Sequence, residues 1–166
     1  VIRAVFFDVG YTLFDETRLW REWAEWLGVE EEQLLAKLRE VITQGRDHRD
    51  LFARLGPGFD LQAEMKGEHV LDGLSACKQV TSTPTLTLPG ECEGKGSAGR
   101  RCRPSSLAYV GDRLDNDVIP ARDAGIYGIL LERGPWGEAH APKAAEMRLP
   151  IITSLQKLPF VLGGLP

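Results

Sequence analysis

The chain has 166 residues, of which 43% are hydrophobic and 27% are charged, and its net charge at pH 7 is −4. This composition is typical of a soluble globular protein, with enough chain for one domain or for a small core domain with an insertion. The negative charge and the lack of a Lys/Arg stripe give no electrostatic reason to expect a nucleic-acid partner.

The sequence also gives no reason to expect a membrane partner. No segment reaches the roughly 18 consecutive apolar residues that a membrane-spanning helix needs. The apolar start, VIRAVFFDVG, is too short for the core of a signal peptide and leads directly into acidic residues. Cys77, Cys92 and Cys102 form neither a CxxC pair nor a Cys/His metal grouping, so we expect reduced thiols. We therefore expect a cytoplasmic protein; its oligomeric state is left open.

The first predicted element is a short buried strand. Residues 2–7, IRAVFF, form an apolar, β-rich run that ends at Asp8 and is followed at once by the turn-forming residues DVGYT. In open α/β sheets, ligands bind at the carboxyl ends of the strands. Asp8 is thus a candidate site residue.

Several helices are predicted directly after this strand. Residues 16–27 carry an apolar face that includes Trp20 and Trp23, and packing of this face explains the tryptophans better than a cofactor-binding or partner-binding role. Further helices are predicted over 30–43, 47–55 and 61–76. Consecutive helices at this place indicate an inserted helical cap over residues 16–70. The core domain would then consist of residues 1–15 and 71–166.

Residues 77–105 differ in character from their flanks. Thr, Ser, Gly, Pro and Arg dominate, and the apolar periodicity nearly vanishes, although QVTSTPTLTL alternates enough for one or two strands. We hypothesise that a segment was lost, or the reading frame disturbed, in this stretch, which leaves an apparently shortened core. Sequencing of the encoding DNA tests this hypothesis, and an intact frame would reject it.

The order of a folded domain returns at SLAYVGD, an apolar strand that ends at Gly111 and Asp112. DNDVIPARDAGI predicts a helix that ends at Gly125, YGILLERG predicts a strand, and LPIITSLQKLPFVL predicts a short strand and a helical turn. LERGPWG (131–137) is interpreted as a loop that carries a packed Trp136. Alternating strands and helices predict an α/β fold with a parallel, doubly wound sheet.

Two acidic loops, FFDVGYTLFD and YVGDRLDNDV, each follow an apolar strand. Parallel strands that lie side by side would bring Asp8 and Asp112 into one crevice, where a divalent cation relieves the repulsion of the carboxylates. Hard oxygen ligands without nearby His or Cys favour Mg²⁺ over Zn²⁺. Each Asp could instead cap the turn that follows it. Two such loops in this order favour the shared site.

The same segments resemble signatures of the haloacid dehalogenase-like (HAD) hydrolase superfamily. FFDVGYTLFD is similar to its first signature, Asp-x-x-x-Thr after an apolar strand, and YVGDRLDNDVIPARDAGI is similar to its fourth. IITSLQKLP is similar to the closing segment of the family. The resemblance covers residues 1–15 and 106–160, and it implies a Rossmann-like core with an inserted cap.

The resemblance also implies a reaction, in which a small phosphorylated metabolite is dephosphorylated through an aspartyl-phosphate on Asp8. Thr12 would hydrogen-bond the phosphoryl oxygens or orient the loop, and Asn116 would position the acids. The implied cofactor is Mg²⁺, with ligands from Asp8, Asp112, Asp117 and the backbone carbonyl of Gly10.

Two departures from the family pattern affect this interpretation. Gly10 stands where the phosphatases carry an Asp that serves as general acid and base, and the loss of such a group typically costs about 10²–10⁴ in rate. The family also places a Ser or Thr after its second core strand and a Lys further on. The candidates here are Thr81 or Ser82 for the hydroxyl and Lys95 for the cation, and each is also consistent with an ordinary loop residue.

The leading hypothesis is thus a Mg²⁺-dependent phosphatase-type hydrolase with a small phosphorylated substrate. Gly10 favours an alternative, a catalytically impaired member that binds Mg²⁺ and phosphate with little turnover. A dehalogenase-like or phosphonate-cleaving hydrolase is a third alternative.

Overall fold

The computed structural model describes residues 1–46, 48–55 and 103–165. They fall into two compact units, with a boundary between Asp15 and Glu16. The described part of the first, the sheet unit, consists of residues 1–15 and 103–165, and that of the second, the helical unit, lies within residues 16–55. The predicted helix over 61–76 and the predicted strands before residue 103 lie outside the described residues. The assignment of residues 16–70 as a cap remains a prediction.

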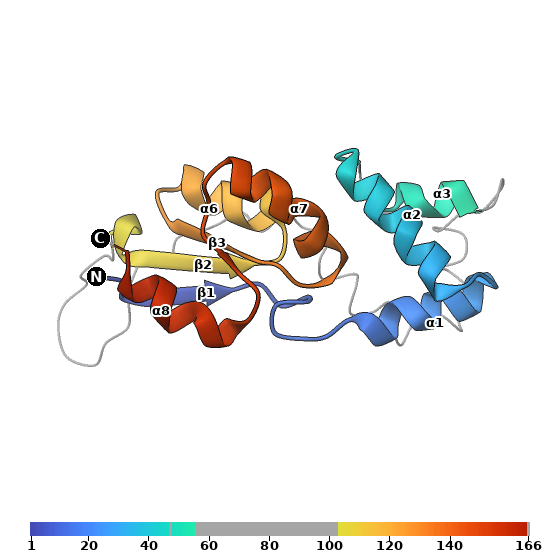
Figure 1. Cartoon of the computed structure of the whole chain (residues 1–166), viewed down its shortest axis with the longest axis horizontal. Helices are drawn as coiled ribbons and strands as arrows, with labels where there is room; N and C mark the ends of the chain where they lie inside the picture. The colour runs from blue at the N-terminus through green and yellow to red at the C-terminus, as the bar shows by residue number, and fades with distance from the viewer. Residues whose placement is uncertain (47, 56–102, 166) are drawn as a thin grey trace. The chain divides into compact units, whose positions relative to one another are not determined.

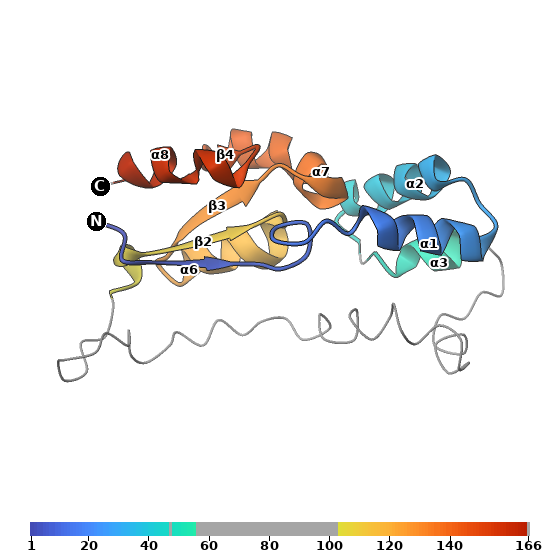
Figure 2. The same cartoon turned by 90° about the horizontal axis from the view of Figure 1, so that it is seen from below.

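The sheet unit is built on four parallel strands that lie in the order β1-β2-β3-β4 (Figures 1 and 2). The strands are β1 (Ala4–Phe7), β2 (Leu107–Gly111), β3 (Tyr127–Leu131) and β4 (Ile151–Ile152). Ala4 is paired with Leu107, so the first strand of the chain lies beside a strand that follows it by more than half of the sequence. The predicted α/β class and parallel sheet are therefore confirmed.

Helices lie on both faces of this sheet (Figures 1 and 2). One face packs Val110, Ile129 and Leu131 against Leu158, and the other packs Leu130 into a cluster with helical residues that include Ala144. Successive strand residues point to opposite faces, so a continuous apolar run such as YGILL fills both cores. A doubly wound sheet is defined by a reversal of the strand order. The described strands follow the chain order without a reversal, so they do not include that feature.

The helical elements of the sheet unit follow the predicted pattern with one exception. The segment predicted as one helix forms a π-helical turn and a short α-helix, and it ends at Gly125, which has a φ of 78°. The elements are η1 (Pro104–Ser106), the π-turn η2 (Leu114–Val118), α6 (Ile119–Asp123), α7 (Gly134–Glu146), η3 (Leu155–Lys157) and α8 (Leu158–Gly163). The short strand and helical turn predicted at the end of this region are confirmed.

The exception is α7, because only residues 132–133 of LERGPWG form a loop and the helix already begins at Gly134. The helix begins at Gly134, and Pro135 occupies its first turn, where a missing N–H costs nothing. Trp136 is buried on this helix. The Gly-Pro pair looks like a turn signal and Pro142 interrupts the pattern further on, so the sequence interpretation was wrong here.

The helical unit contains α1 (Thr17–Leu27), α2 (Glu31–Thr43) and α3 (Asp50–Leu55). α1 ends at Gly28, whose φ of 65° is the left-handed conformation that glycine tolerates. Trp20 and Trp23 are buried, and the ring of Trp23 lies 4.9 Å from that of Phe52, as expected for a packed helix face. α3 begins three residues later than predicted. In the described part of the chain, no helix has the length and apolarity required to cross a membrane.

Candidate metal centre

Asp8 and Asp112 occupy neighbouring positions at the carboxyl edge of the sheet. The amide of Asp8 donates to the carbonyl of Val110 at 2.9 Å, which continues the pairing of β1 and β2 for one residue beyond β1. Asp112 directly follows Gly111, the last residue of β2. The parallel register thus places the two aspartates side by side.

Asp117 is brought to the same place by the π-turn. Its Oδ2 accepts a hydrogen bond from the amide of Arg113 at 2.9 Å, which closes the turn over the end of β2. Gly111 makes this approach possible, since a Cβ at that position would lie 2.3 Å from Asp117 Oδ2. Asp117 can therefore approach the end of β2 only because position 111 has no side chain.

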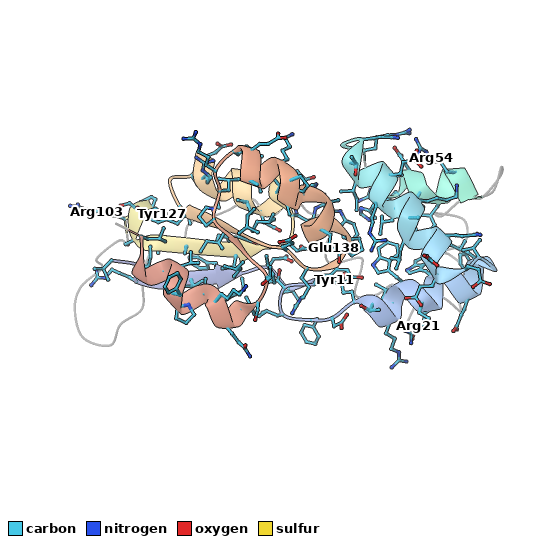
Figure 3. The ribbon with its side chains drawn as sticks, viewed as in Figure 1. Tyr11, Arg21, Arg54, Arg103, Tyr127 and Glu138 are labelled. Carbon is cyan, nitrogen blue, oxygen red and sulfur yellow. The ribbon has the colours of Figure 1, made fainter. Side chains whose placement is uncertain are left out.

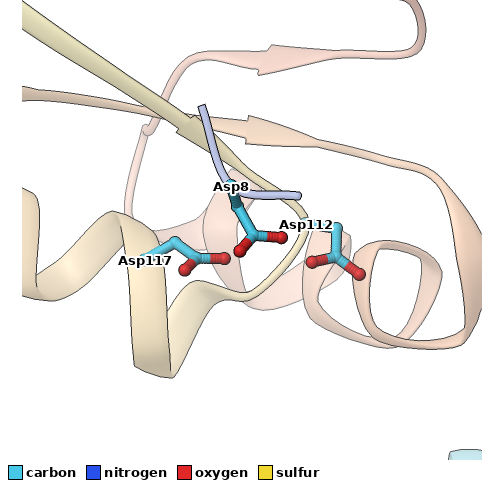
Figure 4. A group of neighbouring side chains, drawn as sticks. All are labelled: Asp8, Asp112 and Asp117. Carbon is cyan, nitrogen blue, oxygen red and sulfur yellow. The ribbon is translucent and has the colours of Figure 1, made fainter. Parts of the chain in front are cut away.

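The three carboxylates form one cluster (Figure 4). One oxygen from each of Asp8, Asp112 and Asp117 lies within 4.8 Å of the others. Asp112 is 3% exposed and Asp117 is 1% exposed, whereas Asp8 is only half-buried. The structure thus brings together the three acids that the sequence predicted as metal ligands, and it leaves Asp8 the most accessible of them.

The cluster carries more negative charge than its surroundings neutralise. Burial, together with the nearby charge of Asp8, raises the pKa of Asp117 to about 7. Burial also raises the pKa of Asp8, although the amide of Val9 and the charge of Arg113 oppose this effect. The pKa of Tyr109 is raised by burial and by all three carboxylates.

The nearest guanidinium is already engaged elsewhere. Arg113 donates from Nη2 to Asp115 at 2.9 Å, and its Cζ lies 5.6 Å from the centre of the Trp136 ring. Burial alone would lower the pKa of Arg113, but the hydrogen bond and charge of Asp115 raise it. Arg113 therefore opposes the raised pKa values of Asp8 and Asp117 without cancelling them, because the pKa of each carboxyl group stays above its ordinary value.

The donor set fits Mg²⁺. All three side chains offer hard carboxylate oxygens, which this ion prefers. Asp117 Oδ1 is buried and has no hydrogen-bond partner among the residues that the structure describes. A buried carboxylate oxygen without a partner is costly, so a cation at this place would supply what the described residues do not.

The loop between Asp8 and Thr12 has an unusual backbone. Tyr11 has a φ of 46°, which lies in the left-handed region that favours glycine over a bulky side chain. Its buried ring packs beside the start of α7, 6.4 Å from the ring of Trp136 (Figure 3). Thr12 is fully buried, and its hydroxyl acts on the neighbouring Asp8, whose pKa it lowers.

Of the other predicted site residues, two lie near the carboxylate cluster in sequence and three lie outside the described residues. Gly10 lies in this loop, and its carbonyl accepts a hydrogen bond from the amide of Thr12. Asn116 lies in the π-turn between two acids and is half-buried. The candidates for the phosphoryl-binding hydroxyl and cation, Thr81, Ser82 and Lys95, lie outside the described residues.

Sequence reasoning missed two arginines, one beside the three-carboxylate cluster and one that contacts the loop after Asp8. Arg113 directly follows Asp112, and Arg133 follows β3, where its side chain contacts the loop of Tyr11. The rule that drew attention to Asp8 and Asp112, that functional residues follow the carboxyl ends of parallel strands, would also have singled out Arg133.

Residues 92–158 match the family model described as HAD-hydrolase-like. This segment of the chain is therefore similar to the HAD-like hydrolases. The matched segment runs from before β2 to the start of α8, so it includes Asp112 and Asp117, whereas Asp8 lies outside the match. No curated protein and no solved structure matched the chain.

Proposed function

We propose that the chain is a Mg²⁺-dependent phosphoric monoester hydrolase that acts on a small phosphorylated molecule through Asp8. The observation that carries this proposal is the cluster of Asp8, Asp112 and Asp117 at the carboxyl edge of the sheet, with its excess of negative charge. The similarity of residues 92–158 to the HAD-like hydrolases supports the hydrolase class.

The difference in exposure supports a division of roles among the three acids. Asp112 and Asp117 are nearly inaccessible, so they are suited to hold a cation, whereas the half-buried Asp8 can reach a substrate. Mg²⁺ bound there would shield the approach of two anions to each other. The hydroxyl of Thr12 is fully buried and lowers the pKa of Asp8, so it is suited to orient the Asp8 carboxylate and the loop.

The reaction would then take two displacements at phosphorus. A carboxylate oxygen of Asp8 attacks in line with the ester oxygen, the P–O bond to the leaving group breaks, and an aspartyl-phosphate forms. Water attacks the same phosphorus next, which releases inorganic phosphate, regenerates the carboxylate and gives up one proton to the solvent.

The weak point of this machinery is proton transfer to the leaving group. Gly10 offers no acid, and the cluster contains no further carboxyl group from the described residues. A leaving group that departs as a stable anion should therefore be turned over far faster than an alkoxide. The same feature favours the second candidate function, binding of Mg²⁺ and phosphate with little turnover.

The decisive experiment measures hydrolysis of p-nitrophenyl phosphate with and without Mg²⁺. We expect Mg²⁺-dependent release of phosphate that is lost in Asp8→Asn and retained in Asp123→Asn, whose carboxyl group is exposed on α6. Equal rates in Asp8→Asn and the unchanged protein would reject the nucleophile. Mg²⁺ binding without hydrolysis would favour the impaired alternative, and metal-free halide release from a 2-haloacid would favour a dehalogenase-like reaction.

A second experiment introduces a carboxyl group at position 10, where the phosphatases of the family carry an Asp. Tyr11 has a positive φ but Gly10 does not, so an aspartate fits the backbone at position 10. We expect Gly10→Asp to accelerate hydrolysis of an alkyl phosphate by about 10²–10⁴. The rate with p-nitrophenyl phosphate should change much less, because that leaving group needs no proton. An unchanged alkyl phosphate rate would contradict this account of Gly10.

A further inference from the structure

Arg133 connects the end of β3 to the loop that follows Asp8. It lies two residues after β3 and immediately before α7, and its own amide is fixed by the carbonyl of Leu131 at 2.9 Å. Its half-buried side chain donates from Nε to the carbonyl of Tyr11 and from Nη2 to the carbonyl of Thr12. One guanidinium thus holds two consecutive carbonyls of the loop.

These contacts complete the hydrogen bonding of the loop. The amide of Thr12 donates to Gly10, and those of Leu13 and Phe14 donate to the carbonyl of Val9 at 2.9 and 3.0 Å. The amides of residues 12–14 are therefore satisfied within the loop, whereas the carbonyls of Tyr11 and Thr12 receive their donors from another part of the sheet unit.

The residue after Arg133 contacts the same loop from a second direction. Gly134 has a φ of 68°, and a Cβ there would lie 2.4 Å from the ring of Tyr11. Arg133 therefore contacts the backbone carbonyl of Tyr11, and Gly134 lies against the ring of the same residue. This double contact accompanies the left-handed conformation of Tyr11, which is unfavourable for a bulky residue by itself.

We propose that Arg133 is a positioning residue that fixes the backbone from Gly10 to Thr12, and with it the orientation of the Thr12 hydroxyl and the Gly10 carbonyl. The inference concerns the loop itself, and its catalytic consequence rests on the function proposed above. Arginine suits this role because its planar group presents parallel N–H donors in a fixed geometry. Lysine keeps the charge but offers a single rotatable ammonium group.

The first test measures amide hydrogen exchange of residues 9–14 in the full-length chain without metal. We expect exchange in this segment to be about tenfold faster in Arg133→Met and intermediate in Arg133→Lys. Arg122→Met, which removes an exposed arginine from α6, should leave it unchanged. Circular dichroism verifies that each variant is folded. If Arg133→Met does not fold, the exchange rate of Arg133→Lys decides the test. Exchange in residues 9–14 that matches the unchanged protein would overturn the inference.

The second test measures what the loop does for the site. In Arg133→Met we expect Mg²⁺ affinity, measured by calorimetry without substrate, to fall about 10-fold, and kcat with p-nitrophenyl phosphate to fall about 10–100-fold. KM should stay within about threefold, because the loss concerns alignment and not substrate capture. Faster loop exchange with unchanged Mg²⁺ affinity and kcat would overturn the positioning role.

The two proposals fail in different ways. If the unchanged protein neither binds Mg²⁺ nor hydrolyses the ester, the proposed function is rejected, while faster exchange of residues 9–14 in Arg133→Met still supports the role of Arg133 in the loop. If the unchanged protein is active and Arg133→Met matches it in all three measurements, the inference about Arg133 is rejected and the proposed function stands.

Discussion

Asp117 concentrates the electrostatic cost of the cluster in one residue. Its pKa is raised from 3.8 to about 7 in the folded protein, first by burial and then by the charge of Asp8. In the unfolded chain it titrates near 3.8. Between these values the folded state holds a proton that the unfolded state has released, so raising the pH through this window lowers stability. The loss is complete above about pH 7 and amounts to about 1.4 kcal/mol per pKa unit.

This predicts how Asp117→Asn changes stability. The measurement is urea unfolding in the presence of EDTA. For the unchanged protein, the free energy of unfolding should be higher at pH 5 than at pH 8. In the variant, which has no carboxylate at this position, the free energy of unfolding should fall less between pH 5 and pH 8. Mg²⁺ at pH 8 should stabilise the unchanged protein, by about 1.4 kcal/mol at ten times the dissociation constant, and the variant less. Asp123→Asn serves as the control. The same fall with pH in Asp117→Asn would contradict the assigned pKa.

Gly111 gives a steric test of the same carboxylate. In Gly111→Ala the new Cβ would have to push Asp117 Oδ2 away, because they would otherwise be 2.3 Å apart. We expect the rate of Mg²⁺-dependent hydrolysis to fall at least about tenfold. A loss of this size is typical when a residue that orients a metal ligand is changed. Gly163→Ala, where nothing lies within 4 Å, should have normal activity. Full activity in Gly111→Ala would show that Asp117 does not need its present position.

At the scale of elements, the strands were easier to predict than the helices around them. β2 and β3 are buried on both faces, so their sequences are continuous apolar runs that stand out from the flanking turns. α7 was missed because its Gly-Pro start and internal Pro142 resemble a loop. The contact of Arg133 with the loop of Tyr11 depends on how two distant segments meet, which no local pattern encodes.

Pro142 offers a test at this scale. It lies inside α7, where it cannot donate to the carbonyl four residues earlier, and its side chain is exposed. We expect Pro142→Ala to raise the free energy of unfolding by about 1–3 kcal/mol without changing Mg²⁺ affinity. Pro159→Ala, in the first turn of α8, should have little effect because that position needs no N–H. A decrease in stability in Pro142→Ala would show that proline benefits the helix through some other contact.

For the whole molecule, the sequence supported the class of fold and the place of the site. Asp8 and Asp112 were predicted to meet because both follow apolar strands, and parallel strands end at one edge. Asp117 came only from resemblance, since its place depends on a π-turn that periodicity does not reveal. The cap remains a prediction, because an apolar stripe shows that a helix packs but not what it does.

The pairing of β1 with β2 has a consequence for how the molecule assembles. Ala4 pairs with Leu107, so about a hundred residues must be looped out before β1 can dock, whereas β2 and β3 are joined by a short crossover. We therefore expect β2, η2, α6 and β3 to form early and β1 to join late. Pulse-labelled hydrogen exchange during refolding should protect residues 107–111 before residues 4–7. On this order, Asp112 and Asp117 are in place before Asp8 arrives, and the proposed nucleophile is the last of the three acids to join the cluster.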